Sequence, residues 1–130
     1  MSLQVSIALL DRANAGEVSN SEFIACVRDS LPYAWKVVSD VAERAHRDGE
    51  GFAEDNSAPP SDVEQGQLLR ALASSSMRGA LEQHFGVTLE FQNCCKVAAF
   101  HPDAVNSPLH RQFVSPRAQL LNQSPELVNC

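Results

Sequence analysis

The chain has 130 residues, of which 10 are basic, 16 are acidic and 44% are apolar, and its formal charge is −6. This length and composition predict one globular domain over residues 1–130. The sequence has no run of about 18 apolar residues, so we expect no membrane-spanning helix. In residues 1–66, acidic residues outnumber basic residues by 12 to 5. Phosphate backbones repel such a chain, and we expect neither a nucleic-acid partner nor a membrane partner.

The N-terminal stretch MSLQVSIALLDRA has no basic n-region, and its apolar part is short and interrupted. It therefore does not predict a signal peptide, and we expect a cytoplasmic protein. Thiols stay reduced in that compartment, so the four cysteines are expected to be free rather than paired in disulfides. They are Cys26, Cys94, Cys95 and Cys130.

The first segments read as helices. Apolar residues between 5 and 13 recur at helical spacing, and Gly16 is expected to end this short helix. Ser19 lies three residues before Glu22, which is the capping-box pattern of a second helix.

Pro32 is expected to break this second helix near residues 30–31, because proline removes one helical hydrogen bond and clashes with the preceding turn. It then suits the first turn of a third helix that ends before Gly49. Glycine, proline and acidic residues dominate residues 49–61, GEGFAEDNSAPPS, and predict an internal loop.

Residues 62–85 predict one long central helix. Ser61 and Glu64 repeat the capping-box pattern, and apolar residues then keep a spacing of 3.6 residues up to residue 85. The stretch also holds small residues, including Gly66 and Gly79, which let another backbone approach closely. We expect tight packing inside the domain, with a homodimer seam as the alternative.

Residues 87–100 predict an antiparallel hairpin. Val87, Leu89 and Phe91 alternate with polar residues, and residues 95–100 are the expected partner strand. Two strands alone are marginal in water, so the hairpin must lie against helices or extend a sheet across a dimer. We therefore expect a mainly helical α+β fold with four to five helices. An all-α bundle with a local hairpin is the alternative.

The C-terminal region contains three Ser-Pro pairs, at 107–108, 115–116 and 124–125. Serine suits the N-cap and proline the first helical position. We therefore expect three short helical turns, at residues 108–113, 116–122 and 125–128.

Two cysteines and two histidines are the candidates for catalysis: Cys94, Cys95, His84 and His101. In a strand, neighbouring side chains point to opposite faces, so the two thiols cannot bind one ion. Their spacing also lacks the short Cys-Cys or His-His pairs of zinc sites. A thiol nucleophile needs a nearby base and a lowered pKa, which nothing in the spacing requires. We expect no metal and no cofactor.

Three stretches resemble a family of small soluble actinobacterial proteins: CVRDSLPYAW (26–35), GQLLRALASSSMRGALEQHFGVTLEFQNC (66–94) and SPRAQLLNQSPELVNC (115–130). Together they cover somewhat under half of the chain. The family brings no activity, cofactor or functional residue. The resemblance therefore implies only a soluble cytoplasmic protein.

The lack of catalytic spacing favours a non-catalytic binding or protein-interaction module, expected to be homodimeric. The alternative is a thiol- or metal-dependent enzyme centred on the four candidate residues above. A second alternative is a small-ligand carrier. The candidate binding residues are Trp35, Phe91 and Phe100 for a ligand pocket, and Arg111 and Arg117 for a local basic patch. The expected partners are a second copy, another protein or a small molecule.

Overall fold

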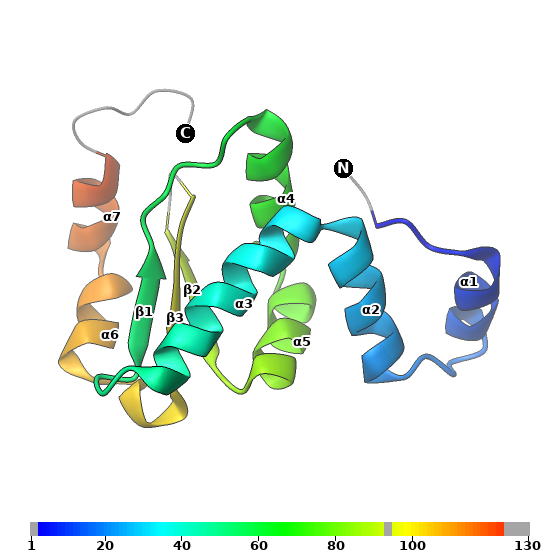
Figure 1. The fold of residues 1–130 in the computed structure, drawn as a ribbon, viewed down its shortest axis with the longest axis horizontal. Helices are drawn as coiled ribbons and strands as arrows, with labels where there is room; N and C mark the ends of the chain where they lie inside the picture. The colour runs from blue at the N-terminus through cyan, green and yellow to red at the C-terminus, as the bar shows by residue number, and fades with distance from the viewer. Residues whose placement is uncertain (1–2, 93–94, 124–130) are drawn as a thin grey trace.

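The structure, a computed structural model, describes residues 3–92 and 95–123, with only the backbone described for 122 and 123. Its elements in chain order are α1 (Ile7–Asn14), α2 (Asn20–Ser30), α3 (Pro32–Arg47), β1 (Phe52–Asp55), α4 (Asp62–Leu72), α5 (Ser75–Phe85), β2 (Thr88–Gln92), β3 (Lys96–Phe100), the 3-10 turn η2 (Pro102–Ala104), α6 (Pro108–Phe113) and α7 (Pro116–Gln123). Figure 1 shows the arrangement. The predicted mainly helical α+β class is confirmed, although the described residues form seven α-helices rather than four or five. None of these helices has the length and apolar character needed to cross a membrane.

A small antiparallel sheet with strand order β1-β3-β2 organises the fold. The central strand β3 is covered on both faces. Val97 and Ala99 point to one face while Ala98 and Phe100 point to the other, and all four are 0% exposed. Helices α3, α4 and α5 lie on the first face, and α6 and α7 lie across the second (Figure 1). The sheet therefore separates two apolar cores.

The two cores differ greatly in size. The larger contains the buried residues Val27, Leu31, Val38, Val41, Leu68, Leu72, Leu81 and Leu89, with Val97 and Ala99 of β3. The smaller contains Ala98, Phe100, Ala104 and Phe113, with Phe52 packed against them. Most of the hydrophobic stabilisation thus comes from the helical layer on the first face, because it scales with the apolar area removed from water.

The predicted start of α2 and the break before α3 are confirmed. The Ser19 Oγ accepts a hydrogen bond from the Glu22 backbone N–H, and the full capping box is present. Helix α2 ends at Ser30 with Leu31 as its C-cap, and Pro32 occupies the first turn of α3. Interactions between residues close in sequence set both helix boundaries, so both could be predicted from the sequence.

The first two C-terminal helical turns also follow their Ser-Pro pairs. Helix α6 has the predicted bounds of 108–113, and the Ser107 Oγ accepts from the His110 N–H. Helix α7 begins at Pro116, as expected, and extends to Gln123. The predicted turn at 125–128 lies outside the described residues.

The prediction of one continuous helix over residues 62–85 is wrong. The chain breaks between α4 and α5, where Ser74 has the extended angles φ −101° and ψ 137°. The Ser74 Oγ accepts a hydrogen bond of 3.2 Å from the Met77 N–H, so this serine acts as a new N-cap. The apolar spacing stays in phase across the break, which is why periodicity alone did not reveal it.

The segment 49–61, predicted as a loop, contains the strand β1. The predicted hairpin corresponds to β2 and β3, and β1 adds a third strand to this sheet. β1 pairs antiparallel with β3, with Phe52 opposite Phe100 and Asp55 opposite Val97. The positive φ of +65° at Gly51 turns the chain into this strand. Pairing with a distant segment, rather than local propensity, makes β1 extended.

Side chains from neighbouring helices bind the backbone of both edge strands. The Arg44 Nη2 donates a 3.0 Å hydrogen bond to the Glu54 carbonyl in β1. The Glu82 Oε2 accepts a 2.8 Å hydrogen bond from the Leu89 N–H in β2. The sheet is therefore tied to α3 along one edge strand and to α5 along the other.

The glycines of α5 give a stability prediction. A Cβ added at Gly79 would meet nothing within 4 Å, and this glycine lies inside the helix. Gly79→Ala should therefore raise the free energy of unfolding by about 0.5–1 kcal/mol, because glycine has more conformational freedom to lose. Urea denaturation followed by Trp35 fluorescence measures the change.

Gly86→Ala is the matched control. Gly86 ends the same helix at φ +68°, where alanine is strained by about 1–2 kcal/mol, so this variant should be less stable than the parent. Equal effects of the two substitutions would contradict the assigned backbone conformations.

Candidate interaction surface

Helix α1 carries apolar side chains that face solvent. None of its residues is buried, and Ile7 and Leu10 are 80% and 52% exposed. Because they are three residues apart, they lie on the same side of the helix. Val5, just before the helix, is 45% exposed. We call these three residues the α1 face. Figure 1 shows α1 beside α2, at the end of the molecule opposite α7.

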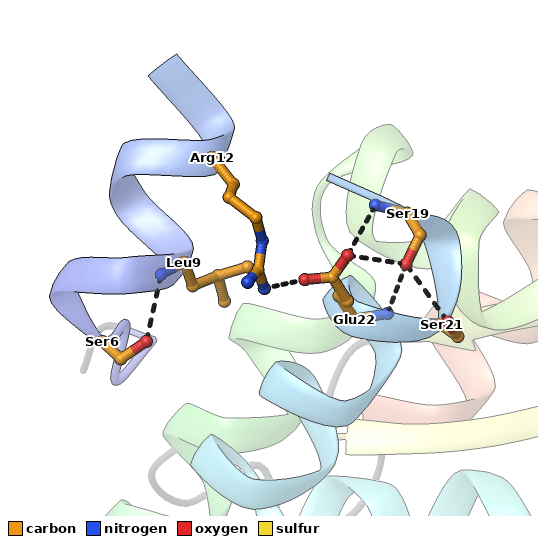
Figure 2. A network of polar contacts seen from close by, with 6 residues as sticks. All are labelled: Ser6, Leu9, Arg12, Ser19, Ser21 and Glu22. Carbon is orange, nitrogen blue, oxygen red and sulfur yellow. Dashed lines mark hydrogen bonds and ion pairs between the residues drawn. The ribbon is translucent and has the colours of Figure 1, made fainter. Parts of the chain in front are cut away.

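Glu22 joins α1 to the start of α2. Its carboxylate forms an ion pair with Arg12 of α1 and accepts hydrogen bonds from the Ser19 N–H and Oγ, at 3.3 and 3.0 Å. Figure 2 shows Arg12 reaching from α1 toward this carboxylate. One side chain therefore serves as both helix cap and inter-helix link.

The segment before α1 is tied to the other end of α2. The Gln4 N–H donates a 2.8 Å hydrogen bond to the Ser30 Oγ, and the Cys26 thiol donates to the Gln4 carbonyl at 3.4 Å. Leu3 packs against the larger core. The chain is thus held at both ends of α1, while the α1 face remains uncovered by the described residues.

Helical spacing predicted α1 but not the exposure of its apolar residues. Periodicity reports which residues share a face and does not report what covers that face. The signal that could have indicated this exposure is the short length of α1. A helix of 8 residues spans about 12 Å at about 1.5 Å per residue and offers little area for internal packing.

Cys95 is a buried free thiol just before β3, 4% exposed and with a positive φ of 65°. Burial raises the pKa of this thiol, and a hydrogen bond with Gln65 acts in the opposite direction. Burial also raises the pKa of Tyr33, with further upward contributions from Asp55, Cys95 and Glu64. Cys94 lies outside the described residues. Cys95 is therefore held as the protonated thiol, which is the unreactive form.

The two candidate histidines do not meet this thiol through the sheet. Cys95 precedes β3, whereas His101 follows it. The two residues therefore lie at opposite ends of a five-residue strand, which rises about 3.3 Å per residue. His84 packs against the rings of Trp35 and Phe85, with centroids 5.4 and 4.8 Å away. The His101 Nδ1 accepts a 3.1 Å hydrogen bond from the Asp103 N–H. His101 thus caps the turn η2.

A cleft that sequence analysis missed lies beside His101. Its volume is about 370 Å³, and the His46 and His101 rings meet edge to face with centroids 5.2 Å apart. The His46 Nε2 is 2.8 Å from the Phe85 carbonyl, so it carries the donated proton. Among the described residues, no group of three His, Cys, Asp or Glu side chains is placed to hold a metal ion.

The candidate binding residues are also dispersed. Trp35 and Phe91 pack against the larger core on the first face of the sheet, whereas Phe100 is fully buried in the smaller core on the second. These three side chains therefore do not line one pocket. Arg111 in α6 and Arg117 in α7 are both exposed.

Comparison with protein families matches the whole chain, residues 1–130, to a family described as NucS shadow ORF. No curated protein matches, and no solved structure matches.

Glu22 gives a prediction about the attachment of α1. Glu22→Ala should lower the free energy of unfolding by about 1–2 kcal/mol, because it removes the helix cap together with the ion pair. Arg12→Ala is the control, since it removes the ion pair alone and should cost about 0–1 kcal/mol. Urea denaturation of both variants tests the order, and a larger loss for Arg12→Ala would contradict the assignment.

The raised pKa of Cys95 predicts slow alkylation at neutral pH. In a Cys94→Ser variant, iodoacetamide should modify Cys95 more slowly than a free thiol at pH 7. The rate should still be rising with pH above the ordinary value of 9.0, where that of a free thiol levels off, because a raised pKa keeps the proton on sulfur to higher pH. Peptide mass spectrometry from pH 7 to 10 measures the rates. Alkylation of Cys95 at pH 7 as fast as that of a free thiol would contradict the prediction.

Proposed function

The chain belongs to the NucS shadow ORF family, and we propose that it is a non-catalytic interaction module that self-associates through the α1 face. The observation that carries the proposal is the exposure of Ile7 and Leu10, 80% and 52%, on a helix without any buried residue. Apolar side chains gathered on one exposed face are typical of protein contacts.

Charge favours a second copy as the partner. Residues 1–66 hold 12 acids and 5 bases, a net charge of −7, so most surfaces of this half repel each other between copies. Helix α1 carries little charge, because its two charged residues, Asp11 and Arg12, have opposite signs. Like-charge repulsion between two α1 faces is therefore weak.

The placement of the candidate catalytic residues supports a non-catalytic role. Catalysis by a thiol requires the thiolate and a base within hydrogen-bond reach. Burial raises the pKa of Cys95, and His101 lies beyond the opposite end of β3. His84 packs against aromatic rings instead. The proposal includes a cytoplasmic protein of actinobacterial origin with no nucleic-acid or membrane partner.

The experiment measures the mass of the native chain by light scattering at tens of micromolar. The parent protein should be a dimer, and Ile7→Asp with Leu10→Asp should give a monomer, because two charges on the α1 face cannot be buried against a second copy. Leu120→Asp is the matched control. Leu120 is 74% exposed on α7, at the opposite end of the molecule, and this variant should remain dimeric.

A monomeric parent at that concentration, or loss of the dimer in the Leu120 variant alone, would overturn the proposal. The family description names an open reading frame and attributes no activity to it. A companion measurement is therefore the detection of the translated chain in its source cells. The tryptic peptide at residues 71–78, ALASSSMR, is a suitable marker for mass spectrometry.

A further inference from the structure

A cavity of about 410 Å³ lies between the second face of the sheet and helices α6 and α7. This volume is in the range of small-molecule sites, about 300–1,000 Å³. The lining side chains come from both sides: Phe52, Glu54, Gln92 and Lys96 from the three strands, and Leu109, Gln112, Phe113, Ala118 and Leu121 from the two helices. The cavity is distinct from the α1 face and from the cysteine region described above.

Gln92 lines this cavity, and its side chain has an unpartnered acceptor. The residue is 3% exposed, and its Nε2 donates a 2.8 Å hydrogen bond to the Phe113 carbonyl. Only an amide nitrogen can donate to a carbonyl, so this bond also fixes which side-chain atom is the oxygen. The Oε1 is buried and has no hydrogen-bond partner among the described residues. A buried acceptor left in this state is unfavourable, and a donor from a bound molecule would relieve it.

The other buried polar groups on this face are already paired. The His110 Nε2 is 2.7 Å from the Glu90 Oε2, and its Nδ1 accepts a 2.9 Å hydrogen bond from the Asn106 N–H. Both ring nitrogens therefore have hydrogen-bond partners, and the Glu90 carboxylate accepts the hydrogen bond that the His110 Nε2–H donates. The Gln92 Oε1 is the acceptor left to recognise a ligand on this side of the sheet, within the part of the chain that the structure describes.

The cavity walls favour a planar and uncharged molecule. Phe52 and Phe113 supply aromatic surface, and Leu109 and Leu121 supply aliphatic surface. The charged groups that line it, Lys96 and Glu54, are paired at 3.8 Å and cancel. A charged ligand would meet one attractive and one repulsive group and gain little from them, whereas a neutral aromatic ligand packs against the rings.

We propose that this cavity binds a neutral, planar, largely apolar small molecule that donates one O–H or N–H hydrogen bond to the Gln92 Oε1. Aromatic alcohols and aromatic amines of two fused rings have this chemistry and fit the volume. The site is independent of the proposed self-association, because it lies at the end of the molecule opposite α1 (Figure 1).

The test compares 2-naphthol with its methyl ether, 2-methoxynaphthalene, on the full chain. The two molecules have nearly the same shape, but the ether cannot donate a hydrogen bond. Naphthol should bind about tenfold more tightly, which is a typical effect of one hydrogen bond to a buried acceptor. Ligand fluorescence gives the affinities, and the shift of the Gln92 side-chain amide in an NMR titration locates the site. This comparison leaves the protein unchanged and does not depend on the folding of a variant.

A pair of variants on α7 tests the location. Leu121 lines the cavity, and Leu121→Trp should fill it and weaken naphthol binding by about tenfold or more. The adjacent Leu120 does not line it and is 74% exposed, so Leu120→Trp should bind naphthol as the parent does. Equal affinity for naphthol and its ether would overturn the proposal. An NMR response away from Gln92, or unchanged binding by Leu121→Trp, would overturn it as well.

Discussion

The burial of β3 on both faces is the constraint on which the rest of the structure depends. Alternate side chains of this strand enter two cores that never meet, with Val97 and Ala99 in one and Ala98 and Phe100 in the other. A shift of one residue in the pairing would exchange the two sets and place Phe100 in the helical layer. Alanine at two of these positions leaves room for helices to approach closely on each side.

This constraint explains why the proposed interaction surface and the proposed ligand cavity lie far from each other. The helical layer on the first face is dense, and α1 extends from its outer side (Figure 1). Among the described residues, the second face is covered by two short helices, α6 and α7, with the turn η2, and they leave a cavity beside Gln92. Self-association and ligand binding can therefore operate without sharing a residue. In the described structure, Cys95 packs in the larger core, His101 caps the turn η2 and His84 contacts aromatic rings.

Sequence reasoning worked where one local interaction decides the structure. Ser19 with Glu22, Pro32, and the serines before α6 and α7 all marked real helix ends, because caps act within four residues. It failed at β1, whose four residues become extended only by pairing with β3 more than forty positions later. It also failed at Ser74, where a cap competes with an apolar spacing that continues in phase. The unpartnered Gln92 acceptor was not predicted for a related reason: whether a side-chain atom finds a hydrogen-bond partner depends on the packing of the second face.

The hydrogen bonds from Arg44 to β1 and from Leu89 in β2 to Glu82 have a consequence for the behaviour of the chain at high concentration. Unpaired strand edges are templates on which further chains add and grow into fibrils. Here a guanidinium and a carboxylate occupy backbone positions that an incoming strand would need. Each bond occupies one backbone group of its edge strand, so an incoming strand has fewer free partners there and sheet-to-sheet polymerisation is less favourable.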